Sequence, residues 1–92
     1  MSVKVHLHKT HRRFTAELGT IEVEGRTVGE CLNALVGRFP DLQPALFQGN
    51  GTQRLRNNIE IYLNLESAYP EELAKPTRTG DEIHIAVMLA GG

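Results

Sequence analysis

The sequence predicts an α+β fold in which a single mixed β-sheet packs against one central helix. Two observations indicate this fold: segments of alternating apolar and polar residues occur near both ends of the chain, and one amphipathic segment with helical spacing lies between them. The chain has 92 residues, of which 40% are hydrophobic. Because this composition is sufficient for one small core, we expect residues 1–92 to form a single domain.

The N-terminal segment is predicted to form a β-hairpin. Residues 3–8 alternate between apolar and polar side chains, which is the period of a strand with one buried face. Residues 9–14 are interpreted as a turn or an irregular connection. Pairing is expected to resume within residues 14–24, so the second strand ends near Gly25.

Residues 27–39 are predicted to form the central helix. Thr27 and Glu30 have the spacing of a capping box, in which a hydroxyl and a carboxylate bond free backbone amides at the start of a helix. Pro40 ends the helix no later than Phe39. The apolar residues of this segment keep to one stripe: Val28, Cys31, Leu32, Leu35, Val36 and Phe39.

The second half of the chain is predicted to supply two more strands. A short helical turn is expected over residues 41–47, and the glycine-containing loop at residues 49–52 is an ordinary turn rather than a phosphate site, because no strand leads into it. Strand alternation returns over residues 59–64 and again over residues 83–89. The intervening residues 65–79 are expected to be connecting structure, since prolines interrupt them.

With one helix available, only one face of the sheet can be covered, so the other face is expected to be open to water. The last strand is expected to lie parallel to the first. This order and pairing of elements is the β-grasp arrangement.

Composition and charge exclude several classes of protein. The net charge is −1, and no basic run exceeds His11-Arg12-Arg13, which argues against binding of nucleic acid. There is no long apolar run or signal-peptide pattern, so we expect no membrane interaction and a cytoplasmic location. One cysteine cannot form an internal disulfide or hold a four-thiolate iron–sulfur cluster.

The chain closes on Met88-Leu89-Ala90-Gly91-Gly92, directly after the last apolar strand. Residues 88–92 are expected to form a flexible tail, because glycine accepts almost any backbone angle and carries no side chain. The terminal carboxylate is ionised at neutral pH, and nothing bulky flanks it. Such an end can enter a narrow channel of another protein and be acylated there; the alternative is an inert, frayed end.

Several segments stand in an order that resembles a known family. They are Thr27-Val28-Gly29-Glu30-Cys31-Leu32 with Leu35, Arg38-Phe39-Pro40-Asp41-Leu42, Ile59-Glu60-Ile61-Tyr62-Leu63-Asn64, Gly80-Asp81-Glu82-Ile83-His84-Ile85 and Ala90-Gly91-Gly92. Together they cover nearly the whole chain and resemble the MoaD and ThiS family of ubiquitin-like sulfur carriers. The sequence departs from that family at Met88 and Leu89, where a proline commonly precedes the terminal glycines.

The resemblance implies a carrier rather than an enzyme, with no catalytic residue, bound cofactor or metal of its own. In the family, an adenylyltransferase of the ubiquitin-activating type uses ATP to convert the terminal carboxylate into an acyl-adenylate. A sulfur donor displaces AMP and leaves a C-terminal thiocarboxylate, which a sulfur-accepting synthase in a biosynthetic pathway consumes (molybdopterin, thiamine, or amino-acid and metabolite synthesis). Carried onto this sequence, sulfur is attached at Gly92, and Gly91 keeps the approach open.

A partner-binding surface is predicted on the open face of the sheet. Tyr62, Ala86 and Met88 occupy outward positions of the last two strands and lead toward Leu89 and Ala90, which makes them a candidate docking patch. The alternative is a set of scattered surface hydrophobes, which are normal on soluble proteins.

Two further groups of residues have a functional and an ordinary interpretation. His6, His8 and His11 suggest a metal site, but solvated histidines are favoured, because no carboxylate or thiolate is clearly spaced to complete it. Cys31 is expected to be a buried structural thiol rather than a nucleophile.

Two rival functions remain open. The diglycine end also suits a ubiquitin-like modifier that is joined to lysines of target proteins through an isopeptide bond. A β-grasp binding module with an inert tail is the other alternative.

Overall fold

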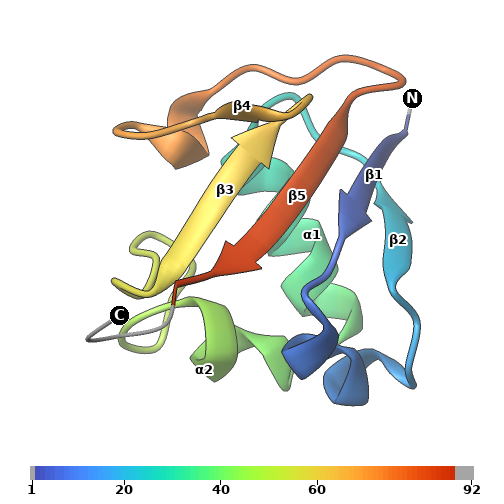
Figure 1. Cartoon of the computed structure of the whole chain (residues 1–92), viewed down its shortest axis with the longest axis vertical. Coiled ribbons are helices and arrows are strands. Elements are labelled where there is room, and N and C mark those ends of the chain that lie inside the picture. Colours follow the sequence, from blue (N-terminus) through green and yellow to red (C-terminus); the bar gives the residue numbers. More distant parts are fainter. Residues whose placement is uncertain (1, 89–92) are drawn as a thin grey trace.

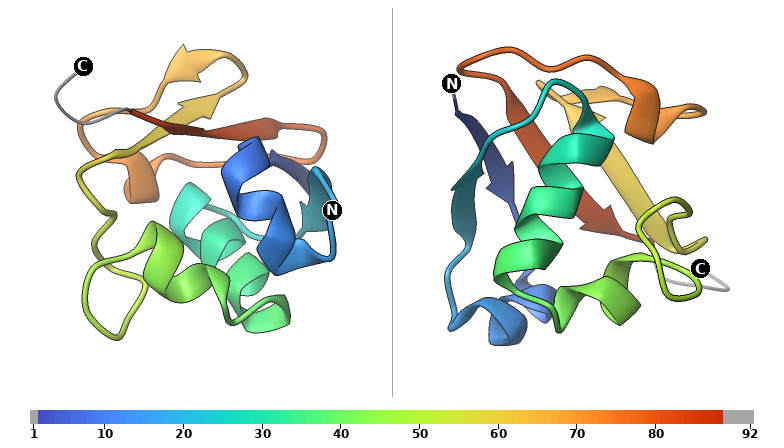
Figure 2. Two further views of the ribbon diagram at one scale, coloured as in Figure 1. Left: turned by 60° about the horizontal axis from the view of Figure 1, so that its bottom comes forward. Right: turned by 180° about the vertical axis from the view of Figure 1, so that it is seen from behind.

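One α-helix lies across one face of a five-stranded sheet in the computed structural model, which describes residues 2–88 (Figures 1 and 2). The strands are β1 (Val3–His6), β2 (Thr20–Val23), β3 (Ile59–Leu63), β4 (Glu66–Ser67) and β5 (Glu82–Val87). The helices are α1 (Val28–Arg38) and α2 (Leu42–Leu46), with two 3₁₀ helices, η1 (Lys9–Thr15) and η2 (Glu72–Ala74).

The sheet is mixed, with the strand order β2-β1-β5-β3-β4. β1 pairs with β2 in the antiparallel sense and with β5 in the parallel sense, so that Val5 lies opposite Ile83 and His6 opposite His84. β3 pairs antiparallel with β5 on the other side. This topology confirms the predicted hairpin, the parallel pairing of the first and last long strands, and the β-grasp fold.

α1 begins and ends where the sequence predicts. The Thr27 hydroxyl oxygen accepts a hydrogen bond from the Glu30 amide at 3.1 Å, and the Glu30 carboxylate accepts one from the Arg26 amide at 2.9 Å, one residue earlier than in a standard capping box. Four residues of the predicted apolar stripe are fully buried: Val28, Cys31, Leu32 and Leu35. Val36 and Phe39 are only partly buried at the edge of this core, so the buried stripe is narrower than predicted.

α2 closes the core at the end of the sheet where β5 finishes. Leu42, Leu46 and the adjacent Phe47 are fully buried, and burial of each such side chain contributes about 1.5–3 kcal/mol. The loop that follows is held by Gln43, whose side-chain amide donates to the carbonyl oxygens of Gly49 and Gly51 at 2.8 Å each. These contacts are those of a hydrogen-bonded turn, as expected.

Residues 9–14, predicted to be a turn or an irregular connection, belong to a regular 3₁₀ helix, η1, which the sequence analysis did not predict. Its helical structure depends on local side-chain bonds that leave no apolar period. The His8 imidazole accepts from the Thr10 amide at 3.2 Å, and the buried Thr15 hydroxyl donates to main-chain carbonyls at both Arg12 and Leu18. The connection over residues 65–79 contains the two short elements β4 and η2. Among the described residues, no helix is long and apolar enough to cross a membrane.

His11 is a polar residue that η1 places in the protein interior. Its side chain is 7% exposed, and its Nδ1 atom has no hydrogen-bond partner among the described residues. Burial is the main reason that the pKa of His11 lies below its ordinary value, and the nearby His8 and Arg13 lower it further. The folded protein therefore favours neutral His11.

This lowered pKa predicts that the protein loses stability as pH falls below about 6.5, the pKa of histidine in an unfolded chain. In that range the unfolded state takes up a proton that folded His11 resists, so the stability present at higher pH is lost progressively in acid. Replacing His11 with Gln should remove this contribution, which is at most about 1.4 kcal/mol per pH unit. Urea unfolding at several pH values measures it. His84→Gln is the control and should keep the dependence of the unfolding free energy on pH that His11 causes. If wild type and His11→Gln showed the same dependence on pH, His11 would not be its source.

Candidate functional site

The face of the sheet opposite α1 is open to solvent (Figure 1). Because side chains alternate along a strand, every second residue of each strand points to this face. The outward residues, all partly or fully exposed, are Lys4, His6, Thr20, Glu22, Glu60, Tyr62, Glu82, His84 and Ala86. The face is therefore mainly polar, with Tyr62 and Ala86 as its apolar members.

Two residues of the predicted patch lie together on this face. Tyr62 pairs with His84 and Glu60 pairs with Ala86 across β3 and β5, which makes Tyr62 and Ala86 diagonal neighbours. The Tyr62 hydroxyl lies 3.5 Å from a carboxylate oxygen of Glu60. The surface around Tyr62 therefore combines an aromatic ring with a carboxylate and an imidazole, and is less apolar than predicted.

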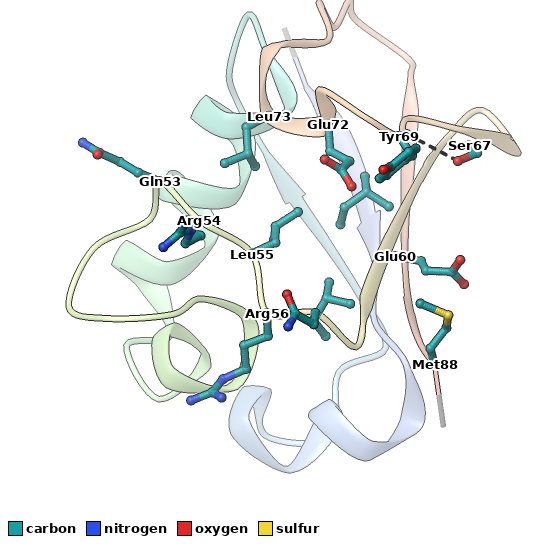
Figure 3. Close-up of a pocket in the computed structure, with 13 residues that line it drawn as sticks. Gln53, Arg54, Leu55, Arg56, Glu60, Ser67, Tyr69, Glu72, Leu73 and Met88 are labelled. Atoms are coloured by element: carbon teal, nitrogen blue, oxygen red, sulfur yellow. Dashed lines mark hydrogen bonds between the residues drawn. The ribbon is translucent and has the colours of Figure 1, made fainter. Parts of the chain in front are cut away.

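Met88 follows directly after β5 and is 48% exposed. Its amide donates to the carbonyl oxygen of Asn58 at 2.7 Å, which continues the β3–β5 pairing by one residue. Met88 also lines a groove of about 560 Å³, shown in Figure 3, together with residues 53–57, β3 and the connection from β4 to η2. The third predicted patch residue thus belongs to the edge of a groove.

Sequence reasoning missed two exposed apolar side chains near this surface. Tyr69 is 75% exposed and lines the same groove as Met88, and Leu65 is 77% exposed in the turn between β3 and β4. Neither belongs to an alternating segment, so periodicity assigns them no face. A large apolar residue in a connection otherwise rich in charge was the signal available for both of them.

The proposed reactive end, Gly91 and Gly92, lies outside the described residues, as do Leu89 and Ala90. What the structure defines is the strand that leads to them. β5 pairs with β1 over residues 82–84 and with β3 as far as Val87. The last described residues are therefore held in the sheet, and β5 ends near α2 (Figure 1).

Basic side chains line the groove beside Met88 and the hollow beside Val87. Arg54 and Arg56 line the groove that Met88 also lines. The Arg56 guanidinium donates to the carbonyl oxygen of Pro44 at 2.5 Å, which holds its stem against α2. Arg13, whose guanidinium lies 4.8 Å from the Phe14 ring centroid, lines a second hollow with Val87. Carboxylates line the same places, Glu60 and Glu72 in the groove and Asp41 in the hollow, so both signs of charge are present there.

The structure does not bring the three N-terminal histidines together. His6 lies on the open sheet face, His8 accepts a hydrogen bond at the start of η1, and His11 is buried. No carboxylate is spaced in the sequence to complete a site with them, but the fold places one beside His6: an oxygen of Glu82 lies 2.6 Å from His6 Nε2. The parallel pairing of β1 with β5 makes this contact, which no spacing in the sequence reveals.

Cys31 is a buried structural thiol, as predicted. It has no exposed surface, and its sulfur lies 3.7 Å from the Thr77 hydroxyl. Burial raises the pKa of the Cys31 thiol, mainly because the thiolate would lose its hydration there. A buried thiol with a raised pKa is a poor nucleophile.

A mixed sheet with its last long strand in the centre, one helix behind it and one open face defines the ubiquitin-like β-grasp class. Small archaeal modifier protein 1 of Haloferax volcanii is 36% identical over 73 residues, which make up 78% of each chain. The chain belongs to the family of ubiquitin-like sulfur carriers and modifiers that contains this relative. No family model matches the chain.

Solved structures agree with this assignment. A chain of the BexX/CysO complex of Amycolatopsis orientalis is 25% identical and has a TM-score of 0.86, with 98% of this chain and 99% of that chain covered. The crystal structure of small archaeal modifier protein 1 from Haloferax volcanii is 29% identical and has a TM-score of 0.83, with both chains covered completely.

Proposed function

We propose that this chain is a sulfur carrier in which the carboxylate of Gly92 is adenylated by a partner enzyme and converted to a thiocarboxylate. The observation that carries the proposal is the sequence Ala90-Gly91-Gly92 at the end of the chain. It comes shortly after β5, the central strand of a ubiquitin-like sheet, and Ala90 is two positions after Met88, the last described residue. Membership of the carrier and modifier family supports it.

The proposed chemistry takes place in two steps. A carboxylate oxygen of Gly92 attacks the α-phosphorus of ATP, which forms an acyl-adenylate and releases pyrophosphate. A sulfide donor then attacks the carbonyl carbon, the bond to AMP breaks, and a thiocarboxylate remains. The partner supplies the nucleotide site and the electrostatic stabilisation. This chain supplies an unbranched end, because a β-carbon at Gly91 would widen it. A sulfur-accepting synthase consumes the product.

The adenylyltransferase is proposed to dock on the open sheet face and the groove edge, through Tyr62, Ala86 and Met88, with Leu89 and Ala90 entering its channel. An aromatic side chain surrounded by polar groups is typical of the centre of a transient interface. Similarity to a chain of the BexX/CysO complex, a structure with a partner bound, supports docking of this kind. With its buried, free Cys31, the chain suits the reducing cytoplasm, where we place the reaction.

Sulfur transfer predicts a defined change in mass. Incubation with a ubiquitin-activating-type adenylyltransferase, ATP and sulfide should shift the intact mass by one oxygen replaced by sulfur. Deletion of Gly92 should abolish the shift, because the carboxylate would then be displaced from the reacting phosphate. Intact-protein mass spectrometry measures both. No shift and no acyl-adenylate with several such enzymes would favour a binding module with an inert tail.

Docking on the open face predicts that Tyr62→Glu slows adenylation by about fivefold or more, since loss of a central interface aromatic commonly costs more than about 1 kcal/mol. The rate of ATP–pyrophosphate exchange measures this effect. Leu18→Glu adds the same charge at another exposed apolar residue, away from β3 and β5, and should leave the rate unchanged. Equal rates for the two folded variants would exclude Tyr62 from the docking surface.

Protein modification is the second candidate function, because the curated relative is named a modifier protein. It requires the same adenylate, followed by transfer of Gly92 to a lysine amine instead of to sulfide. The two functions differ in their products. Tryptic peptides of cell extract that carry residues 79–92 of this chain on a lysine, since Arg78 is the last arginine or lysine before the end, would establish modification. The thiocarboxylate alone would establish the carrier.

A further inference from the structure

Three metal-binding side chains from opposite ends of the chain meet on the open face of the sheet. His6 is the last residue of β1, and Glu82 and His84 lie in β5. One ligand atom from each of these residues can be chosen so that all three lie within 4.8 Å of one another. We propose that His6, Glu82 and His84 bind a divalent transition-metal ion such as Zn²⁺, Ni²⁺ or Cu²⁺.

The strand register creates this cluster. His6 and His84 are directly paired across the parallel strands, and their imidazole rings stack with centroids 4.4 Å apart and planes 19° apart. Glu82 precedes His84 by two residues, so its side chain points to the same face. Three donors of suitable type are thus fixed to two adjacent hydrogen-bonded strands, which hold a site more accurately than loops do.

The separations between ligand atoms in the cluster differ from those around a bound ion. His6 Nε2 lies 2.6 Å from a carboxylate oxygen of Glu82, which is hydrogen-bonding distance. Ligand atoms around tetrahedral zinc lie about 3.3 Å apart, given bonds of about 2.0–2.1 Å. A metal ion lies in the plane of each imidazole that binds it, so one of the two stacked rings has to rotate out of the stack to direct both nitrogens at one ion. His6 and His84 are partly exposed and Glu82 is exposed, which leaves room for this rotation.

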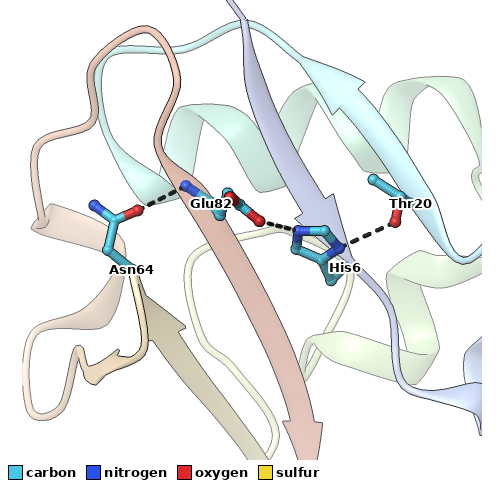
Figure 4. Close-up of polar contacts among 4 residues, drawn as sticks. All are labelled: His6, Thr20, Asn64 and Glu82. Carbon is cyan, nitrogen blue, oxygen red and sulfur yellow. Dashed lines mark hydrogen bonds and ion pairs between the residues drawn. The ribbon is translucent and has the colours of Figure 1, made fainter.

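The neighbours of His6 and Glu82 support ligation (Figure 4). His6 Nδ1 lies 3.0 Å from the Thr20 hydroxyl, which engages one ring nitrogen and leaves Nε2 as the ligand atom, directed at Glu82. Metal-bound histidines characteristically have such a partner on the second nitrogen. The Glu82 amide donates to the Asn64 side chain at 2.9 Å, which anchors the start of β5.

The donor set indicates the class of ion. Two imidazoles and one carboxylate suit zinc, nickel or copper rather than calcium or magnesium, which prefer oxygen ligands alone. Three protein ligands on a solvent-exposed face leave a further coordination position for water or for a side chain of another protein. Since Tyr62 pairs with His84, a bound ion would lie beside the aromatic ring on the open face.

The test is isothermal titration of Zn²⁺ into the full chain without an affinity tag, in a buffer that does not chelate metal. We expect one ion per chain. His6→Gln and His84→Gln should each weaken binding by more than about tenfold, since even outer-shell changes cost about that much. His8→Gln is the matched control, an N-terminal histidine outside the cluster, and should bind as wild type does. Thr20→Val should weaken binding less than the loss of a ligand.

Copper provides a second readout that does not depend on affinity. The electron paramagnetic resonance spectrum of the Cu²⁺ complex should show two nitrogen ligands in wild type and one in His6→Gln or His84→Gln. Circular dichroism of each variant identifies any that does not fold. If one of the two histidine variants is unfolded, the spectrum of the other tests the proposal. Absence of saturable binding, or equal binding by wild type and both folded histidine variants, would overturn the proposal.

Discussion

The parallel pairing of β1 with β5 is the constraint on which the rest of the structure depends. It joins the first and last long strands side by side in the centre of the sheet, although nearly the whole chain lies between them. Parallel neighbours cannot be connected by a tight turn, so the chain must cross over one face of the sheet. α1 makes this crossing, and its buried stripe offsets the entropy of closing so long a connection.

This pairing also divides the sheet into two chemically different faces. The face under α1 takes the apolar residues of every long strand, because only that face is removed from water. The opposite face takes a tyrosine, an alanine, charged residues and histidines. The hydrophobic core uses the apolar residues of one face only, so the residues of the other face are not constrained by packing and can serve binding.

β5 connects the candidate sites on that face. Its outward residues follow one another as Glu82, His84 and Ala86, after which Met88 lies at the groove. The strand changes from polar, metal-ligating chemistry at its start to apolar contact at its end. A partner that draws the tail into a channel would thus meet the apolar end first, while the histidine and carboxylate cluster lies farther from the end of β5.

Much of the fold could be predicted from the sequence because it is encoded locally. Alternation in residues 3–8, 59–64 and 83–89 predicted β1, β3 and β5, although β1 ends at His6 and residue 89 lies outside the described residues. Thr27, Glu30 and Pro40 predicted the limits of α1. The short helix η1 could not be predicted, since the side-chain bonds that form it leave no period.

The sequence by itself also determined the terminal diglycine, a covalent feature that needs no fold to be recognised. Only the tertiary structure decided which outward residues became neighbours. His6 and His84 are 78 positions apart and meet only because two strands pair in parallel with a particular register. Tyr69 and Met88 line one groove because a connection returns to the sheet edge. Such contacts depend on strand order and register, which arise from packing of the whole core and which no local pattern contains.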